Sequence, residues 1–318
     1  MQKLKFLALA SVLLAACSQQ SPQTQTSQPI QGQALQCGQS TIQWAGRTWT
    51  VKDSQGSEVG PGPNVFTPQN ICVDDVTGQL VMRLDPSAGV WESAEIKTQQ
   101  TLGTGTYTWN MVGDFSTIDR QVVLGLFPYS TIAPAGRPDS DGYKEMDIEF
   151  ARWGNDSNGP VNYTVYPGTV EGRNLLINSG YSPYTAEGQS FHQKFSQSLG
   201  GTYTTHRITR TANYVLMEGF HGHTTQLSNR FRCTRFQVYN TGNQTLLETT
   251  NRTNAGAIST STQSIAGWYD ASHFISAESM PLHMNLWLFR ADNPANFQPV
   301  EFRFNNFTFT STPQVSSC

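Results

Sequence analysis

Charged residues are scarce in this chain. Lysine, arginine, aspartate and glutamate make up 14% of its 318 residues, and the formal net charge is −3. The sequence has no basic stripe of the kind that binds nucleic acid and no acidic run that would collect cations. The charge pattern therefore indicates no particular binding partner, and we do not expect the protein to bind nucleic acid.

Long apolar runs are also missing. The apolar run at residues 6–16 follows Lys3 and Lys5 and is too short to cross a bilayer as a helix, which favours a cleaved secretory signal. The residues Leu14-Ala15-Ala16-Cys17 resemble the lipobox of bacterial lipoproteins, and that resemblance implies that Cys17 becomes a lipidated first residue. An ordinary signal peptide with an incidental cysteine is the alternative.

The segment immediately after Cys17 is not expected to fold. Residues 18–36 are rich in Gln, Ser, Thr and Pro, carry no charge and have too few apolar groups to bury a core. We expect a signal peptide over residues 1–16, a lipid anchor and tether over 17–36, and one folded domain over 37–318. The chain is then an exported lipoprotein at the cell surface, outer membrane or periplasm. We expect a monomer that touches the membrane only through its lipid.

Cysteines are few, and their number is informative. With Cys17 set aside, four remain in an exported chain, which predicts two disulfides. Close spacing suited to structural zinc is not found among them. Three pairings are possible and the sequence does not decide between them; we favour Cys37 with Cys72 and Cys233 with Cys318.

Apolar spacing of three and four residues, which marks helices, is not found over any long stretch. Short strand-like segments recur instead, separated by Gly, Pro, Asn, Asp and Ser clusters. This pattern predicts an all-β domain of two packed antiparallel sheets. In the last segment the alternation changes parity near Asn305-Asn306, which predicts a β-bulge. The segments are residues 80–84, 105–111, 121–127, 161–166, 206–208, 214–217, 231–239, 282–289 and 300–309.

Motifs for serine or cysteine nucleophiles and for phosphate-binding glycine loops are missing. The sequence does contain an acidic residue at every second position of residues 145–150. Because side chains alternate along a strand, one face carries the acids and the other carries Met146, Ile148 and Phe150. Like charges on one face repel and raise each other's pKa values, an arrangement typical of catalysis. The acids are Glu145, Asp147 and Glu149.

The spacing of the two glutamates suits glycoside hydrolysis. Side chains that lean together from positions 145 and 149 of a strand can bring their carboxyls to about 5–6 Å, near the separation in retaining glycosidases. One carboxylate then attacks the anomeric carbon, and the other protonates the leaving oxygen and later activates water. Asp147, between them, can keep one glutamate ionised and the other protonated.

Glu145-Met146-Asp147-Ile148-Glu149 resembles the E-x-D-x-E signature of family 16 glycoside hydrolases, which include lichenases and laminarinases. Weaker similarity covers most of residues 80–309, at 91–98, 105–109, 123–129 and 284–287. The resemblance implies a concanavalin A-like β-jelly roll that cleaves a polysaccharide, with a β-glucan the expected substrate. It also implies that Glu145 is the nucleophile, Asp147 its assistant and Glu149 the acid/base. Arg210, where the family commonly has tryptophan, and the altered hairpin at 214–223 leave subfamily and substrate open.

Four residues are candidates for binding the sugar. Trp153 and Trp287 have rings that can stack on the C–H faces of sugars, although core packing is the alternative for Trp287. Tyr166 and Asn162 lie on the segment after the acids and can reach a sugar hydroxyl, although a structural role is the favoured interpretation for both.

Metal binding is not predicted. His206, His221 and His223 lie near one another in the sequence, but no carboxylate or cysteine stands at ligand spacing beside them. Solvated imidazoles on a hairpin are the favoured interpretation. No cofactor is predicted, and the sequence is silent on bound calcium.

Two other functions stay open. A transglycosylase keeps the same chemistry and passes the sugar to another glycan instead of water. A carbohydrate-binding surface protein uses the same fold without cleaving its ligand, because a fold does not fix function.

Overall fold

The computed structural model describes residues 35–130, 144–180, 190–253, 256–314 and 316–318. Residues Gln33–Cys318 make up one compact unit. The signal peptide and Cys17 predicted from the sequence lie outside the described residues. Strand β1 (Leu35–Cys37) pairs with β5, so ordered structure begins two residues before the predicted domain boundary. Within the described ranges, no helix is long and apolar enough to span a membrane.

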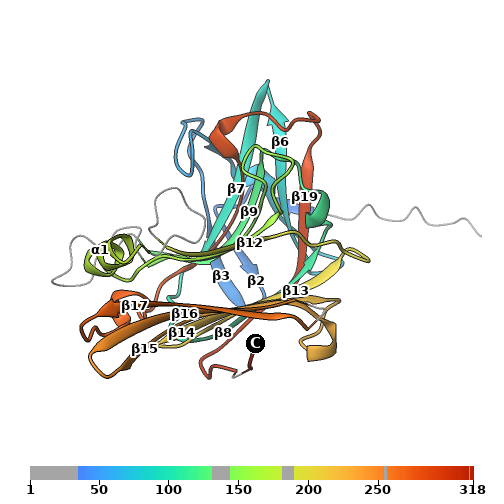
Figure 1. Ribbon diagram of the computed structural model, residues 1–318. Coiled ribbons are helices and arrows are strands. Elements are labelled where there is room, and N and C mark those ends of the chain that lie inside the picture. The colour runs from blue at the N-terminus through green and yellow to red at the C-terminus, as the bar shows by residue number, and fades with distance from the viewer. Residues whose placement is uncertain (1–34, 131–143, 181–189, 254–255, 315) are drawn as a thin grey trace, which may run out of the picture. The chain divides into compact units, whose positions relative to one another are not determined.

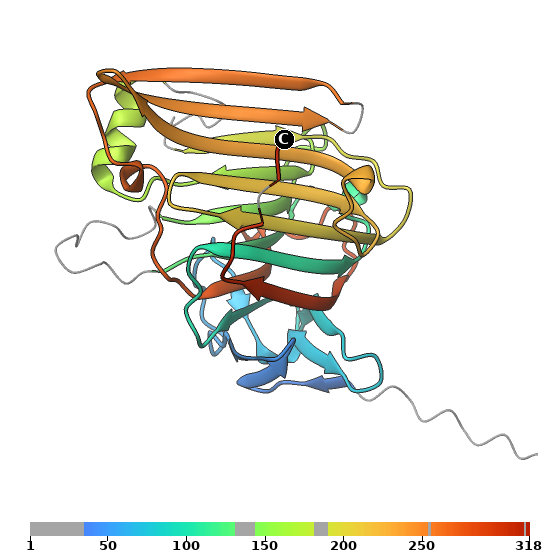
Figure 2. The same ribbon diagram turned by 90° about the horizontal axis from the view of Figure 1, so that it is seen from below.

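Two antiparallel sheets face each other, and Figure 1 shows them from the side. Sheet A, seen from below in Figure 2, is the larger one. Each of its strands pairs with the next in the order β1 (Leu35–Cys37), β5 (Ile71–Asp74), β6 (Leu80–Ser87), β19 (Val300–Thr310), β8 (Gly105–Val112), β13 (Tyr203–Arg210), β14 (Tyr214–His221), β15 (Arg230–Thr241), β16 (Gln244–Thr253) and β17 (Ile258–Ala266).

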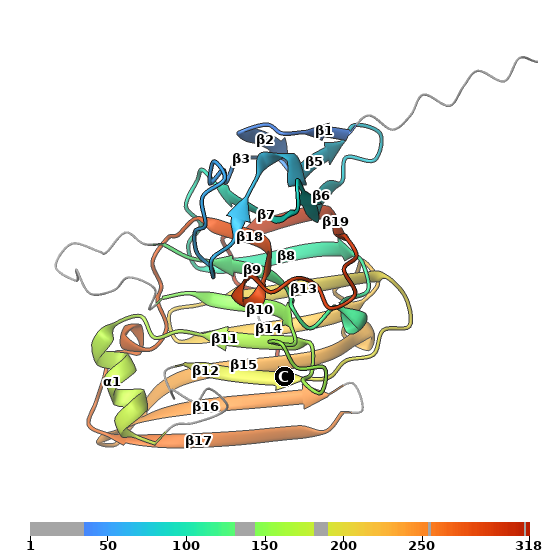
Figure 3. The same ribbon diagram turned by 90° about the horizontal axis from the view of Figure 1, so that it is seen from above.

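Sheet B is seen from above in Figure 3, and it carries the acidic strand. The short strand β4 (Val65–Phe66) runs parallel to β7, and the β6–β7 hairpin connects the two sheets. The strands of sheet B, in order, are β2 (Thr41–Trp44), β3 (Arg47–Val51), β7 (Val90–Thr98), β18 (Leu282–Leu288), β9 (Val122–Pro128), β10 (Met146–Ala151), β11 (Val161–Val165) and β12 (Phe191–Phe195).

The core lies between the sheets and is rich in aromatic rings. Phe150 of sheet B contacts His206 of sheet A with ring centroids 4.8 Å apart, and Trp49 of sheet B contacts Phe307 of sheet A at 5.9 Å. All four side chains are buried. Alternating apolar residues on each strand supply this interface, as expected when two sheets pack face to face. The predicted all-β jelly-roll sandwich is confirmed.

The last strand contains the predicted bulge. The pairing of β19 with β8 shifts register between Phe304 and Asn306. Phe302, Phe304 and Phe307 are all buried, so one extra residue returns the aromatic side chains to the core.

One α-helix, α1 (Val170–Asn178), was not predicted from the sequence. The Thr169 hydroxyl caps it by accepting the Gly172 N–H at 3.0 Å. Only Gly172 and Leu176 are buried, which is too few to give a helical apolar pattern. A Cβ on Gly172 would lie within van der Waals radii of the His273 carbonyl, so the helix packs there only with glycine. Short 3₁₀ turns occur at Pro68–Asn70, Phe115–Thr117, Leu227–Asn229, Ala271–His273 and Phe289–Ala291.

Both disulfides join the pairs favoured from the sequence. Cys37 bonds to Cys72 and connects β1 to β5. Cys233 of β15 bonds to Cys318 and ties the C-terminal segment to the outer face of sheet A (Figure 2).

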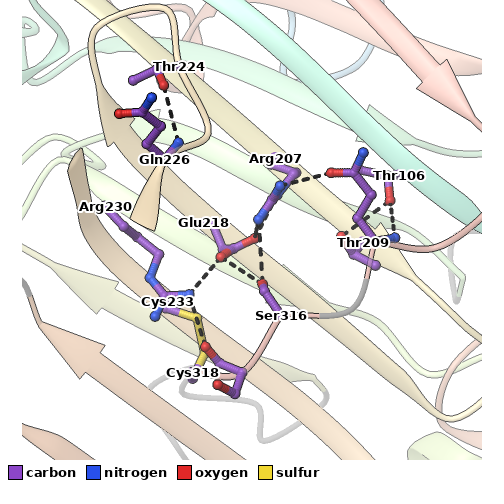
Figure 4. A network of polar contacts seen from close by, with 12 residues as sticks. Thr106, Arg207, Thr209, Glu218, Thr224, Gln226, Arg230, Cys233, Ser316 and Cys318 are labelled. Carbon is purple, nitrogen blue, oxygen red and sulfur yellow. Dashed lines mark hydrogen bonds and ion pairs between the residues drawn. A yellow bond between two sulfur atoms is a disulfide. The ribbon is translucent and has the colours of Figure 1, made fainter. Parts of the chain in front are cut away.

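A buried carboxylate lies beside the Cys233–Cys318 bond (Figure 4). Glu218 is fully buried and forms ion pairs with Arg207 at 2.6 Å and with Arg230 at 2.8 Å. The Ser316 hydroxyl of the C-terminal segment donates to the same carboxylate at 3.1 Å. The segment therefore completes the coordination of a charge that would be costly to leave unpaired.

Candidate active site

Strand β10 turns its apolar residues inward and its acids outward. Met146, Ile148 and Phe150 are fully buried in the core between the sheets. By alternation, Asp147 and Glu149 lie on the outer face of sheet B. Glu145 stands one residue before β10, and its carbonyl accepts the Tyr166 N–H at 2.9 Å, which continues the pairing. The three acids therefore occupy one face, as the sequence predicts.

A cavity of about 400 Å³ opens above this face. Its volume falls within the roughly 300–1,000 Å³ of ligand-binding clefts. Glu145 and Glu149 both line it, whereas Asp147 is only 4% exposed and lies between them. The other lining residues are Lys52, Gly60, Pro61, Glu95, Phe127, Tyr129, His283, Asn285 and Trp287.

Asp147 and Glu145 share a side-chain hydrogen bond. Burial raises the pKa of Glu145 to about 7, the bond from Asp147 opposes that rise, and the charge of Glu95 adds to it. Burial, followed by the charges of Glu145 and Glu149, raises the pKa of Asp147 well above its ordinary value. The ionisation of Asp147 and that of Glu145 therefore depend on each other.

The pKa of Glu149 is also raised. Burial, with the charge of Glu145 as the second cause, raises the pKa of Glu149 to about 8. All three acids therefore hold their protons to a higher pH than free carboxyl groups do. Buried, crowded acids with raised pKa values are typical of catalytic sites.

A row of residues in register crosses the floor of the cavity. Glu149 lies opposite Gly125, Gly125 opposite Asn285, and Asn285 opposite Glu95. A Cβ on Gly125 would lie 2.5 Å from Asn285 Oδ1, so the glycine leaves the space between Glu149 and Asn285 open. Among the described residues, Asn285 Oδ1 is buried without a hydrogen-bond partner, which leaves it available to a ligand donor.

Sequence reasoning missed a charged cluster at one side of the cavity. Glu95 of β7 bonds to Lys52 Nζ at 2.8 Å and to His283 Nδ1 at 3.0 Å. Burial opposes ionisation of Glu95, but the bonds to His283 and Lys52 outweigh it and hold its pKa below the ordinary value. Glu95 and His283 are far apart in the sequence and meet only through the pairing of β7 with β18. No local motif could have revealed the cluster.

The two tryptophans predicted to bind sugar occupy different positions. Trp287 lines the cavity and is 9% exposed. Trp153 packs behind it, with ring centroids 6.3 Å from Trp287 and 5.5 Å from Phe289, and it does not line the described cavity. Trp153 therefore supports the Trp287 ring.

Asn162 and Tyr166 also lie outside the lining. The amide of Asn162 makes structural contacts on both sides, which agrees with the structural role favoured from the sequence. Its Nδ2 donates to the Ala151 carbonyl at 3.0 Å and its Oδ1 accepts from Trp153 Nε1 at 3.1 Å. Tyr166 is partly buried beside Glu145, to which it donates its backbone N–H.

The three histidines considered for metal binding have separate surroundings. His206 is buried among aromatic rings, and burial lowers its pKa to about 3. His221 packs on Phe231, and His223 Nε2 bonds to the Met111 carbonyl at 3.1 Å. The part of the chain that the structure describes holds no group of three His, Cys, Asp or Glu side chains suited to a metal ion.

No protein-family model matches the chain, and no curated protein matches it either. Its structure is similar to several solved glucanases, all at low identity. They include a Bacillus licheniformis β-glucanase, with 17% identity, a TM-score of 0.46 and coverage of 82% of this chain and 91% of that one. A lichenase from a mouse hindgut metagenome has 14% identity and a TM-score of 0.45, covering 84% of this chain and 93% of the other.

A further similar structure is a glycoside hydrolase of family 16 from Bacteroides ovatus, solved in complex with a mixed-linkage glucan product. It shares 11% identity with this chain at a TM-score of 0.49, over 82% of this chain and 94% of that one.

Proposed function

We propose that this protein is a retaining, endo-acting glycoside hydrolase of family 16 that cleaves β-glycosidic bonds in a polysaccharide, with a β-glucan as the substrate. One observation carries the proposal. Three carboxyl groups lie on one face at a cavity of about 400 Å³, and burial raises the pKa of each. A binding protein gains nothing from crowding three buried acids whose ionisation is opposed by their surroundings.

Each acid has a role in the reaction. Ionised Glu145 attacks the anomeric carbon while protonated Glu149 transfers its proton to the departing oxygen. A covalent glycosyl-enzyme results, and the leaving part of the glycan departs as an alcohol. Glu149, now ionised, takes a proton from water as that water attacks the anomeric carbon and releases Glu145. Asp147 keeps its proton throughout and donates a hydrogen bond to Glu145 when that carboxylate is ionised.

The rest of the cavity is suited to a sugar. The Trp287 ring offers an apolar surface for the C–H face of a sugar unit. Asn285 Oδ1 can accept from a sugar hydroxyl, and the Lys52–Glu95–His283 cluster offers further polar groups beside it. Small-ligand sites usually combine an apolar surface with a small number of polar groups.

The function is tested with Glu145→Gln and Glu149→Gln on a panel of β-1,3-, mixed-linkage and galactan polymers. Both variants should lose at least about a thousandfold in kcat/KM, since general acid–base catalysis alone contributes roughly 10²–10⁴. Glu171→Gln is the matched control, because Glu171 lies exposed on α1. Wild-type activity in both catalytic variants would exclude the mechanism.

Product analysis on the same panel separates the two alternatives. Longer glycans formed at high substrate concentration would identify a transglycosylase, whereas tight binding without new reducing ends would identify a binding protein. Reducing ends and shorter products alone are the expected result.

We also propose that the enzyme is anchored at the cell surface or in the outer membrane or periplasm through a lipid on Cys17. The lipobox-like residues 14–17 support this proposal. Substitution of Cys17 by alanine should move the protein from the membrane fraction to the soluble fraction, and unchanged fractionation would contradict it.

A further inference from the structure

The outer face of sheet B continues past the acids onto β11 and β12. Asp147 lies directly opposite Thr164, and Thr164 lies directly opposite His192. Neighbouring strands are about 4.8 Å apart, so β12 lies roughly 10 Å from β10. Figure 3 shows the three strands side by side, with α1 beside their ends. This side of the acids is opposite to the side on which Glu95 and Lys52 lie, because β9 and β18 separate β10 from β7.

Thr164 and His192 form a buried polar pair. The Thr164 hydroxyl and His192 Nδ1 are 2.9 Å apart, and the two residues are 2% and 9% exposed. Burial, with the charge of Lys194 as the second cause, lowers the pKa of His192 to about 4. The imidazole is therefore neutral at neutral pH, with one ring nitrogen as donor and the other as acceptor.

The second ring nitrogen of His192 has no hydrogen-bond partner among the described residues. Nδ1 is occupied by Thr164, and no residue that the structure describes hydrogen-bonds Nε2. Because a neutral imidazole is held by Thr164 in one orientation, Nε2 presents a fixed polar atom, and a ligand hydroxyl can serve as its partner whichever nitrogen carries the proton.

Lys194 stands on the same face, two residues along β12. It lies opposite Asn162, which in turn lies opposite Glu149. Its side chain is partly exposed, and its ammonium forms no ion pair or hydrogen bond within the described residues. Lys52, on the other side of the acids, is paired with Glu95. The Lys194 ammonium can thus donate up to three hydrogen bonds to a ligand.

We propose that Thr164, His192 and Lys194 form a sugar-binding subsite for a glycan unit beyond the one that is cleaved, on the side of the acids away from Glu95. His192 Nε2 and the Lys194 ammonium bind hydroxyl groups of that unit, and Thr164 positions the imidazole. The subsite rests on the proposed function, because it needs a glycan that extends along the outer face of sheet B.

The test measures binding of β-glucan oligosaccharides of increasing length by calorimetry, in the Glu145→Gln protein so that the ligand survives. Adding His192→Ala should raise the Kd of the longer oligosaccharides about threefold to tenfold. Adding Lys194→Ala should raise it about tenfold or more, since a bond to a charged group is the stronger one. Short oligosaccharides that do not reach β12 should bind as before. His223→Ala is the matched control, because it removes a hydrogen-bonded imidazole that lies just after β14 of sheet A, away from the acids.

In the active enzyme, the same substitutions should raise KM for long substrates and leave kcat within about twofold, whereas a general loss of structure would lower kcat. Lys194→Gln and His192→Gln keep most of the side-chain volume and guard against misfolding. Kd values unchanged within twofold in both alanine variants would overturn the subsite alone. If the Glu145→Gln protein binds no glycan of the panel, the proposed function is overturned and the subsite with it.

Discussion

The carboxyl groups of Asp147 and Glu145, which are neighbours on the outer face of sheet B, share a hydrogen bond. The bond opposes the effect of burial on the pKa of Glu145. In the proposed mechanism Asp147 acts on the reaction through Glu145, because its proton is donated in a hydrogen bond to the ionised nucleophile.

Asp147→Asn should therefore be milder than Asp147→Ala. An asparagine amide can still donate to Glu145, whereas alanine leaves the carboxylate without its donor. We expect a loss in kcat/KM of about tenfold for asparagine and at least about a hundredfold for alanine, with the acidic limb of the pH profile moved to higher pH in the alanine variant. A pH series of kcat/KM measures both, and equal losses with an unchanged profile would contradict the role given to Asp147.

Gly125 separates Glu149 from Asn285, and a side chain there should block the floor of the cavity. An alanine Cβ would lie 2.5 Å from Asn285 Oδ1 and 3.3 Å from the Phe127 ring. Gly125→Ala should reduce kcat/KM at least tenfold while the thermal unfolding temperature changes little, because the displaced atom is the end of a side chain. Gly200→Ala, with nothing within 4 Å of its Cβ, is the control. Full activity of Gly125→Ala would show that the floor is not used.

The raised pKa of Glu149 predicts a cost in stability. The folded protein holds this proton up to a pH of about 8, whereas an unfolded glutamate releases it near 4.5. Between these values the folded state binds more protons than the unfolded state, so the free energy of unfolding falls as pH rises. Glu149→Gln removes the titrating group, and the variant should gain in unfolding temperature relative to wild type from pH 5 to pH 8. A difference that is the same at both pH values would contradict the raised pKa.

The Cys233–Cys318 bond should matter for stability and not for activity. It closes a separation of 85 residues and holds the C-terminal segment beside Glu218, on the sheet opposite to the acids. Cys318→Ser should lower the free energy of unfolding by about 2–4 kcal/mol, the usual effect of losing a disulfide. Denaturant unfolding measures it, and kcat/KM should stay within twofold of wild type. A large loss of activity in the folded variant would show coupling between the two sheets.

Local patterns in the sequence predicted much of this fold. The alternation in residues 145–150 placed three acids on one face, and the change of parity at Asn305-Asn306 located the bulge of β19. Both features repeat with a period of two and need no information from distant residues.

Other parts could not be predicted locally. Strand β17 is rich in serine and threonine and almost wholly exposed, so it shows no apolar alternation and exists through its pairing with β16. Glu95 and His283 meet only in the register of β7 with β18. Asn162 has the right residue type and a position opposite Glu149, but Trp153 and the Ala151 carbonyl occupy its amide. Which residues line the cavity depends on such tertiary contacts.

The proposed mechanism requires that Glu145 forms a covalent bond to the sugar while Glu149 supplies the proton. An activated 2-deoxy-2-fluoro glucoside of the preferred substrate slows breakdown of the glycosyl-enzyme, and mass spectrometry of peptides then locates the label. We predict that one label per protein molecule is found on Glu145. The fraction of activity lost should equal the fraction of protein labelled. Labelling of Glu149 instead, or an active enzyme whose products have inverted anomeric configuration, would contradict the mechanism.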